Sequence, residues 1–427
     1  MMKRLEDLID NLARNEPGWL SSIRKEAFGR FLRTRLEMPV DSPTVKHYTD
    51  IKDEELGAYR PLDFKAAERH RPHCEEGENC LIEWDTTMQS MRLDRGSRSK
   101  GVVLAPLGDE RTFDEYGDIL KKRLFSFLDP FEDKFAMMNA AFWSGGVFIY
   151  VPEGVQVALP IHLLRGVKMP GQAEVTRNLL VAGKESSVNV FEDLVGTDVE
   201  TLRNDVFEVV VEDGAKVEFQ SIQDVGPKMK RVSRYRARVE RDASMRWFPA
   251  VFGSNWSVCR VESTLAGKGA SNETYSAFLG HGSERIDFAN NTFHLAPKTS
   301  NVIFARGIML GRSSSVYRGN IEIHILAKHS TSQMKEETLL LSKDADAKAI
   351  PSLSIRTNEV QAKHAASVYQ IDEAQTYYLM SRGLSKEEST RLMVEGFFAP
   401  IIDKLSLGKF RNRLEEKVVR GVHDGQN

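Results

Sequence analysis

Four residues with metal-binding side chains lie close together before residue 81. His70, His73, Cys74 and Cys80 fall within eleven positions, and neutral imidazole and thiolate are the donors that zinc prefers. Their spacing matches no standard zinc knuckle, and the acidic stretch at 75–78 is typical of a solvated loop. The sequence therefore allows a zinc site here but favours a loop without metal.

Other candidate ligands stand alone in the second half of the chain. His281, His294 and His329 fall in strand-like or turn segments, where a lone histidine is more often hydrogen-bonded or exposed, because a metal needs several converging donors. Cys259 also lies in a strand-like segment, where a free cysteine commonly packs as a small hydrophobe. Its basic neighbour Arg260 should point to the opposite face, so nothing obvious lowers the pKa of the thiol. Cys259 is thus only a secondary candidate for metal binding.

Signatures of common catalytic sites are missing from the sequence. There is no G-x-x-x-x-G-K-[ST], and Gly267-Lys-Gly269 lacks the third glycine of a dinucleotide fingerprint. G-x-S-x-G, H-E-x-x-H and C-x-x-C are also absent. If the protein's work requires ATP, we expect another subunit to bind it.

Composition narrows the class of protein. A chain of 427 residues is long for one compact domain, but an elongated repeat with helical ends would fit. The net charge of −2 provides no field of one sign for nucleic acid or a membrane surface. The chain has no run of 18 apolar residues, no secretory signal at its start, and only three cysteines. We expect a soluble, cytoplasmic protein with reduced thiols that binds neither nucleic acid nor membranes.

The elements that would position these residues follow from periodicity. Apolar residues recur at helical spacing in residues 1–36, and the segment 39–100 is read as an irregular linker packed on the core. Residues 113–143 return to helical spacing. From residue 145 the period changes to two, which indicates strands.

The strand-rich region continues for two hundred residues with regularly spaced turns. Small-residue corners recur about every fifteen residues in its later part, for example at 280–282, 298–300, 311–314 and 328–330. Such spacing favours a solenoid in which each coil passes two corners and parallel pairing needs no crossover helix. A six-residue apolar repeat, typical of the left-handed form, is missing. We therefore predict a right-handed parallel β-helix.

Helical patterns return after the β region. A helix is expected to begin at Asp372 or Glu373 and to end before Gly383, and Ser385-Lys-Glu-Glu388 is a capping box for a second helix. We expect part of the apolar stripe of that helix to pack on the β-helix, and the rest, with Phe398, to meet a partner. The predicted divisions are an N-terminal helical region and linker (1–100), a helical lead-in (101–144), the β-helix core (145–371) and a C-terminal helical region and tail (372–427).

The segment 333–405 carries a more specific signal. It reads LLLS at 339–342, P-x-L-x-I at 351–355, H-A-A-S at 364–367, I-D-E at 371–373 and Y-L-M-S-R-G-L at 378–384. With related spacing from about residue 17 to 398, this pattern resembles the SufB/SufD family, whose members form the scaffold on which iron–sulfur clusters are assembled. The resemblance implies a β-helix as well.

Within that family the sequence is more similar to SufD than to SufB. SufB-type chains tend to carry a cysteine shortly before the position of Pro351 and a glutamate directly after that of His364, where this chain has Ala345 and Ala365. A further SufB-type cysteine falls on Ser263. The ligand-rich chemistry of SufB is therefore not expected of this chain.

The resemblance implies a subunit of a SufBCD complex that is not itself an enzyme. Its expected partners are a SufC-type ATPase, bound through the C-terminal helices, and a SufB-like chain or a second copy, bound at the β-helix end as a dimer. His364 occupies the family position near the subunit interface, where it is expected to bind metal or a transient iron–sulfur cluster; the alternative is a histidine packed near the β-helix end. No resident cofactor is expected.

A second class of function stays open at this point. A β-helical carbohydrate-active enzyme would need carboxylates spaced for acid–base chemistry on one face. Asp205, Asp287 and Glu322 are scattered in the sequence rather than clustered. The scaffold function is favoured, chiefly on the resemblance.

Overall fold

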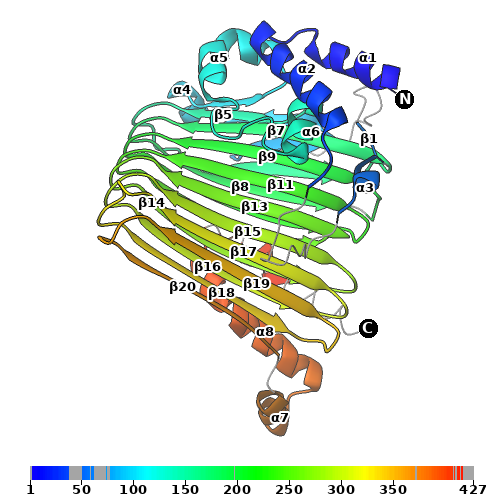
Figure 1. The fold of residues 1–427 in the computed structure, drawn as a ribbon, viewed down its shortest axis with the longest axis vertical. Coiled ribbons are helices and arrows are strands. Elements are labelled where there is room, and N and C mark those ends of the chain that lie inside the picture. The colour runs from blue at the N-terminus through cyan, green and yellow to red at the C-terminus, as the bar shows by residue number, and fades with distance from the viewer. Residues whose placement is uncertain are drawn as a thin grey trace.

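Two facing β-sheets stacked into a long coil form the body of the protein, with helices at both ends (Figure 1). The computed structural model describes residues 2–37, 51–57, 59–61, 74, 77–196, 198–370, 373–406, 408, 411–413 and 415–416. Each sheet has ten strands.

Odd-numbered strands from β5 onward make the first sheet, here called sheet A. Its path runs from β19 at one end to β4 at the other, and the short β1 pairs with β7 off this path. The members are β1 (Arg60–Pro61), β4 (Val103–Pro106), β5 (Val147–Val151), β7 (Gln172–Ala182), β9 (Leu202–Val211), β11 (Lys230–Val239), β13 (Trp256–Leu265), β15 (Arg285–His294), β17 (Ser314–Ile323) and β19 (Asp346–Ile355).

Sheet B faces sheet A and contains the even-numbered strands from β6 onward. It runs from β20 to β6 and ends with the hairpin β2–β3. The members are β2 (Asn79–Trp84), β3 (Thr87–Arg92), β6 (Ile161–Val167), β8 (Ser187–Gly196), β10 (Lys216–Val225), β12 (Ser244–Gly253), β14 (Ser271–Gly280), β16 (Ser300–Met309), β18 (Thr331–Leu340) and β20 (Gln361–Gln370).

The chain alternates between the two sheets, so each coil contributes one strand to each. Successive coils pair in parallel and in register: Ser271 pairs with Ser300, and Ser300 with Thr331, 29 and 31 positions later. Along β9, Phe207, Val209 and Val211 point into the space between the sheets and join its apolar core. This confirms the predicted mainly-β fold, a parallel β-helix flanked by helical regions.

Helices cover the outer face of sheet A over its first coils (Figure 1). Arg24 is buried there and donates to the carbonyls of Ala141 and Trp143 at 2.7 and 3.1 Å, which ties the second N-terminal helix to the end of the helix that precedes β5. The N-terminal elements are α1 (Met2–Ala13), α2 (Gly18–Arg33), α3 (Asp53–Gly57), α4 (Arg95–Ser99), α5 (Glu110–Arg123) and α6 (Lys134–Phe142).

Two predictions for the N-terminal region need correction. The segment 113–143 is not one helical stretch, because residues 124–133 separate α5 from α6. The segment 39–100 is not irregular throughout, because Asn79–Trp84 and Thr87–Arg92 form a hairpin that continues sheet B. The apolar run of β2 is short and buried, and a run this short shows no clear period in the sequence. Residues 38–50 and 62–73 of the predicted linker lie outside the described part of the chain.

The C-terminal helices are α7 (Glu373–Ser381) and α8 (Lys386–Ile402). The predicted capping box is confirmed, since Ser385 accepts from the Glu388 amide at 3.1 Å and Glu388 accepts from the Ser385 amide at 2.7 Å. Gly383 follows α7 with φ +97°, as expected of a residue that ends a helix.

Helix α8 packs on the outer face of sheet B, where Val394, Phe398 and Ile401 are buried against strands β8 to β18. The expectation that Phe398 meets a partner is therefore wrong, because its side chain is completely buried within the single chain. Leu392, on the opposite side of α8, is exposed. None of the described helices is long and apolar enough to cross a membrane.

Candidate functional site

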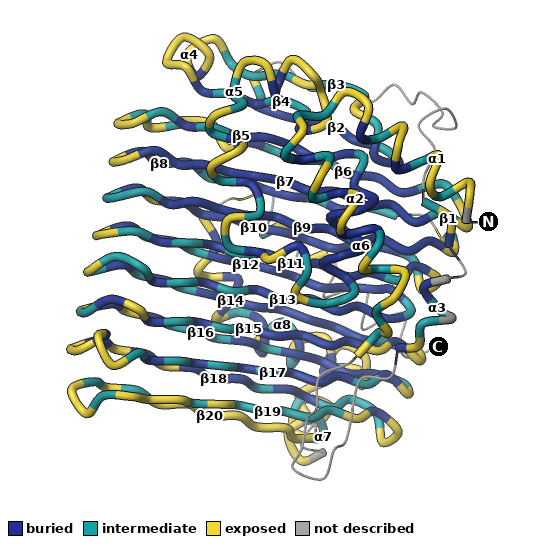
Figure 2. The backbone as a smooth tube through the Cα atoms, turned by 45° about the horizontal axis from the view of Figure 1, so that its top comes forward, coloured by how far each residue is buried: buried dark blue, intermediate teal, exposed yellow. Residues whose placement is uncertain are grey.

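The last coil of the β-helix, formed by β19 and β20, has one edge of each strand without a neighbour among the described strands. Its residues are exposed or half-buried, unlike the buried strands behind them (Figure 2). An unpaired strand edge offers a row of backbone donors and acceptors to another chain. We call β19 and β20 together the open end.

His364 lies on β20 at this open end. It pairs in register with Met334 of β18, whose side chain is part of the core between the sheets. Since parallel strands in register share their faces, His364 belongs to the inward-facing row of the last coil. Its side chain is nevertheless exposed, so the alternative of a packed histidine does not hold for the single chain.

Glu336 lies one coil deeper, on the inward face of β18. It pairs with Ala305, a core residue, on one side and with Ala366 of β20 on the other. One carboxyl oxygen accepts from the Thr338 hydroxyl, while Oε2 is buried without a hydrogen-bond partner among the described residues. Burial raises the pKa of Glu336 to about 7. The sequence analysis did not single out this residue.

Cys259 is buried in the interior on β13, in register with Ser233 of β11. Burial raises the pKa of its thiol to about 11. A hydrogen bond with Ser233 and the charge of Arg231 both lower the pKa, but burial outweighs them. The expectation of an unreactive core cysteine agrees with this environment. Arg231 is its inward-facing basic neighbour, which the sequence alone did not reveal.

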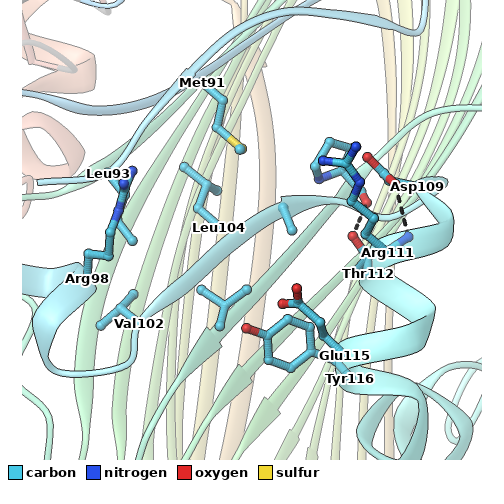
Figure 3. A pocket seen from close by; sticks show the side chains of 13 residues that line it. Met91, Leu93, Arg98, Val102, Leu104, Asp109, Arg111, Thr112, Glu115 and Tyr116 are labelled. Atoms are coloured by element: carbon cyan, nitrogen blue, oxygen red, sulfur yellow. Dashed lines mark hydrogen bonds between the residues drawn. The ribbon is translucent and has the colours of Figure 1, made fainter.

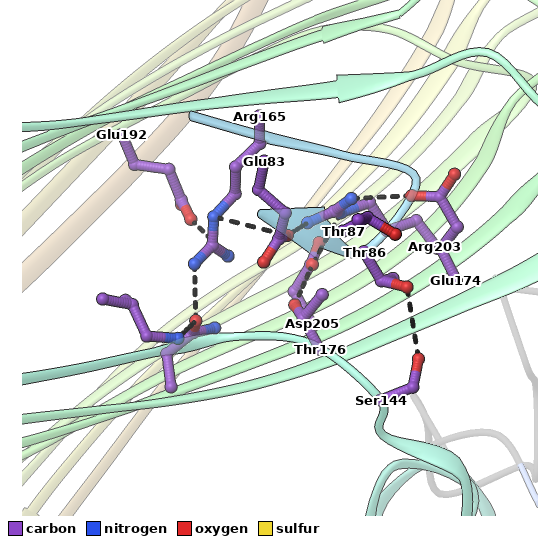
Figure 4. A network of polar contacts seen from close by, with 12 residues as sticks. Glu83, Thr86, Thr87, Ser144, Arg165, Glu174, Thr176, Glu192, Arg203 and Asp205 are labelled. Carbon is purple, nitrogen blue, oxygen red and sulfur yellow. Dashed lines mark hydrogen bonds and ion pairs between the residues drawn. The ribbon is translucent and has the colours of Figure 1, made fainter. Parts of the chain in front are cut away.

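A ring of buried charged groups and one tyrosine crosses the interior of the first coils, and Figure 4 shows its part around Arg165, Glu83 and Arg203. It joins strands of both sheets and includes the hairpin strand β2. In order around the ring, its members are Glu83, Arg165, Glu192, Tyr235, Arg231, Asp205 and Arg203.

Arg203 is the most connected member of the ring. Its guanidinium lies 2.7 Å from Asp205, 2.8 Å from Glu174 and 3.5 Å from Glu83. Glu83 is also 4.0 Å from Arg165. This side of the ring ties β2, which lies next to the terminal strand β3 of sheet B, to β7 and β9.

The other side of the ring runs through Tyr235. Arg231 lies 2.9 Å from Asp205 and donates to the Tyr235 hydroxyl at 3.1 Å. That hydroxyl donates to Glu192 at 2.7 Å, and Glu192 pairs with Arg165 at 3.1 Å. Each charge in the ring thus faces an opposite charge or a hydrogen-bond partner, the condition under which buried ions are tolerated.

The ring sets the protonation of its carboxyl groups. Burial alone would disfavour ionisation of Asp205, but Arg203 and Arg231 outweigh it and lower the pKa to about 2. Burial raises the pKa of Glu174 well above its usual range, because Arg203 compensates only in part and Asp85 adds negative charge. The charges of the ring pair with one another, although Nε and Nη1 of Arg165 lack a hydrogen bond among the described residues, and we assign the ring a structural role.

The remaining histidines have ordinary partners. His294 is buried with Nδ1 2.7 Å from the Thr299 hydroxyl, and burial lowers its pKa to about 4. His281 and His329 lie 3.5 Å from Glu284 and Glu359, respectively. His294 is thus a hydrogen-bonded core histidine and His329 an exposed one, whereas the half-buried His281 lies beside a carboxyl group.

The possible zinc ligands before residue 81 are only partly described. His70 and His73 lie outside the described residues. Cys74 and Cys80 form a disulfide with Cα atoms 5.9 Å apart, so the expectation of reduced thiols is wrong for this pair. Disulfide sulfurs are not thiolates and do not serve as zinc ligands. Across the described residues, no three His, Cys, Asp or Glu side chains converge as a metal site.

The three carboxylates weighed for an enzyme do not form an acid–base pair. Asp205 belongs to the interior ring, whereas Asp287 lies on the outer face of sheet A between Arg260 and Arg318. Glu322 pairs with Arg356 at 3.2 Å. The groove beside Asp287, of about 330 Å³, is lined largely by charged residues that pair with each other. The carbohydrate-enzyme alternative therefore gains no support.

A second cleft, of about 310 Å³, lies at the other end of the β-helix (Figure 3). Met91, Leu93 and Leu104 contribute apolar side chains, and Arg98 and Arg111 lie at its sides. Its walls come from β3, β4, α4 and α5, so it is separated from the open end by the whole length of the β-helix. It does not contribute to the candidate site.

The fold defines a β-helical protein with one capped end and one open end. The family model "SUF system FeS cluster assembly, SufBD core domain" matches residues 165–397, more than half of the chain. The chain therefore belongs to the SufBD family of iron–sulfur cluster assembly proteins.

Curated relatives support this assignment over most of the chain. The chain is 27% identical to the iron–sulfur cluster assembly protein SufD of Bacillus subtilis, with 95% of each chain covered. It is 30% identical to SufB of the same organism, covering 78% of this chain and 71% of SufB. A SufBD family protein of Staphylococcus aureus is 28% identical, with 92% and 87% covered. The match to SufD is thus the more complete in length.

Proposed function

We propose that this chain is a SufD-like subunit of a SufBCD-type scaffold and is not an enzyme itself. Its partners in this proposal are a SufB-like chain or a second copy at the open end, and a SufC-type ATPase at the C-terminal helices. The observation that carries the proposal is the open end itself, a coil with one strand edge on each sheet that has no neighbour among the described strands, and which bears the family histidine His364.

Several residues support a SufD-like rather than a SufB-like role. Where SufB-type chains tend to carry cysteine or glutamate, this chain has Ser263, Ala345 and Ala365. Ser263 is buried and bonded to Trp247 and Asn272, at 3.0 and 2.8 Å. These side chains supply no thiolate, so a cluster assembled at the open end would need sulfur ligands from a partner.

Pairing is proposed to occur through β19 and β20. Besides unpaired backbone groups, this end exposes the apolar side chains of Ile355, Val368 and Tyr369. Burying apolar area stabilises association by about 25 cal/mol per Å² before the costs of association. A dimer by sedimentation at micromolar concentration would support this arrangement, and a monomer would count against it.

The ATPase is proposed to bind helix α7 and the outward side of α8. Tyr377, Tyr378 and Met380 of α7 and Leu392 of α8 are exposed, although they are large and apolar or aromatic. Removing everything after Gly383 would be an ambiguous test, because it would also uncover the face of sheet B beneath α8. Substituting serine for Tyr377 and Leu392 is sharper, since neither side chain is buried in the chain.

In the complete complex, ATP binding would rearrange the paired scaffold and open the interface at His364 to iron and sulfide. ATP shifts such an equilibrium only through contacts that differ between the two states. His364 is proposed as an interface ligand or proton carrier in this step, and Cys259 is not expected to take part.

The function is tested by purifying the tagged chain from cells and measuring partners, iron and sulfide. We expect a SufC-type ATPase and a SufB-like chain, or a second copy, to co-purify. The variant His364→Ala should assemble with the same partners yet fail to support cluster formation, while Cys259→Ser should be nearly silent. Normal cluster yield from an assembled His364→Ala complex would remove the ligand role. Sugar-lyase activity would favour the enzyme alternative.

A further inference from the structure

We propose that Glu336 is a second ligand at the open end, and that Glu336 and His364 of one chain together hold one ferrous ion. This inference rests on the proposed function only in naming iron as the ion. The two donors come from neighbouring strands, β18 and β20.

The register places both side chains on one face at reachable separation. Met334 pairs with His364, and Glu336 pairs with Ala366, so Glu336 and His364 are diagonal neighbours on the inward face. With strands about 4.8 Å apart and a rise of about 3.3 Å per residue, their Cα atoms are separated by roughly 8 Å. Two long side chains can meet across this distance at an ion bound about 2 Å from each donor atom. The Glu336 carboxyl would turn toward His364 to do so, because its present partner Thr338 lies on the opposite side.

The carboxyl of Glu336 is only half satisfied within the chain. The Thr338 hydroxyl donates to one oxygen and the backbone amide of Ser367 also favours the ionised carboxyl, whereas Oε2 is buried and has no hydrogen-bond partner among the described residues. No Lys or Arg pairs with it there, although the neighbouring Glu337 pairs with Arg306 on the outer face. A buried carboxyl oxygen without a partner is costly, and a bound cation would remove that cost.

Only small side chains cover this carboxyl from the open end. Ala366 of the last coil pairs in register with Glu336. Ala349 of the last coil pairs in register with Tyr317, a buried residue of β17 whose pKa is raised in part by the charge of Glu336. His364 in the same last coil is exposed. Larger inward residues at these two positions would close the path between His364 and the carboxyl. The methyl groups of the two alanines leave this path open.

The chemistry of the donors favours a first-row divalent ion. Imidazole and carboxylate suit ferrous iron, manganese and zinc, whereas magnesium and calcium prefer oxygen ligands alone. Two protein donors leave several coordination positions for water, sulfide or groups from a partner. This agrees with the lack of any three-donor site in the described part of one chain.

The test measures ferrous iron binding to the full-length purified chain under anaerobic conditions, with cobalt(II) as an optical substitute. We expect one ion per chain, and Glu336→Gln and His364→Ala should each weaken binding at least about tenfold. The matched control is Glu337→Gln, which changes the adjacent carboxylate on the outer face and should leave affinity unchanged. Cobalt(II) bands in the visible spectrum should change in Glu336→Gln but not in Glu337→Gln.

Three results would overturn the proposal: no saturable binding by the wild-type chain, wild-type affinity in Glu336→Gln, or equal losses in Glu336→Gln and Glu337→Gln. Thermal melting of each variant guards against loss of fold, and glutamine keeps the size of the side chain. The same samples are tested for ATPase binding. Failure to bind an ATPase would count against the proposed function while leaving the iron result intact.

Discussion

Replacing Glu284 by glutamine should flatten the pH dependence of stability between about pH 5 and pH 8. Glu284 lies in the turn between β14 and β15, where its carboxylate accepts from the His281 amide at 3.1 Å. Burial raises the pKa of this carboxyl to about 8, against an ordinary value of 4.5. The folded protein therefore keeps a proton that the unfolded chain releases.

The sign and size of the effect follow from this difference. Below pH 4.5 the carboxyl is protonated in both the folded and the unfolded state, so Glu284 contributes nothing to the pH dependence of stability. Between 4.5 and 8 the unfolded state binds fewer protons, so rising pH lowers the free energy of unfolding by about 1.4 kcal/mol per unit. At pH 7 the accumulated loss is roughly 3 kcal/mol, and above the folded pKa it grows no further.

Urea unfolding of wild type and Glu284→Gln at about pH 5, 6.5 and 8 would measure this term. We expect the two proteins to differ little at the lowest pH, and the variant to be progressively more stable as the pH rises. His281 is the titratable side chain facing Glu284, with Nε2 3.5 Å from the carboxylate. His281→Ala should keep the wild-type slope. Parallel curves for wild type and Glu284→Gln would refute the reasoning.

Other predictions follow from the interior. Asp205→Asn should cost about 3–5 kcal/mol of unfolding free energy in urea titrations, because it leaves Arg203 and Arg231 buried without their shared partner. Lys228→Ala, in an exposed pair, should leave the unfolding midpoint nearly unchanged. Cys259 should resist thiol reagents until the protein unfolds, since its pKa is raised to about 11 and it is buried; fast labelling of folded protein would contradict this. Gly253→Ala should destabilise far more than Gly282→Ala, because both have positive φ but only at Gly253 would a Cβ meet backbone, 2.0 Å from the Val225 carbonyl. Similar melting temperatures for the two variants would be inconsistent with the model of a close coil contact.

The repeat of the β-helix was predictable because its signal is distributed. Small-residue corners return at regular intervals, and alternation along each strand repeats in every coil. Positive-φ glycines at 214, 269 and 311 occupy such corners, a role that few other residues fill without strain. The helix ends were equally readable, since the capping box at Ser385 depends on four neighbouring residues. Local rules of this kind need no knowledge of the tertiary fold.

The interior ring was not predicted, although its signal is present. In β9 the odd positions that hold Phe207 and Val209 also hold Arg203 and Asp205. Following this alternation back toward the start of β9 places Arg203 and Asp205 inside the coil. Buried charges of this kind need partners of opposite charge or hydrogen bonds. Those partners lie on β2, β7 and β11, and their pairing depends on the register between coils. Sequence periodicity indicates which face a residue occupies but not which residue stands opposite.

Glu336 and His364 illustrate the same limit at the other end. His364 was found through family resemblance, whereas Glu336 lies in the run Lys-Glu-Glu, which in isolation reads as a solvated stretch. Only the alternation of β18, which buries Met334 and Glu336 and exposes Lys335, separates it from Glu337. The structure thus converts two adjacent, chemically identical residues into a paired surface carboxylate and an unpaired interior one.

The two ends of the interior differ in whether their buried charged groups face opposite charges, and this difference supports the proposed place of the chemistry. Near the N-terminal end, the charges of the ring all have partners, and the hairpin β2–β3 and the N-terminal helices close the coil. Such a network favours a single packing of the side chains, because removing any member leaves another buried charge without its partner. At the open end, Oε2 of Glu336 has no hydrogen-bond partner among the described residues, and one edge each of β19 and β20 has no neighbour among the described strands. A second chain can satisfy the strand edges and an ion can satisfy the carboxyl, so pairing and iron binding would stabilise the same end of the molecule together.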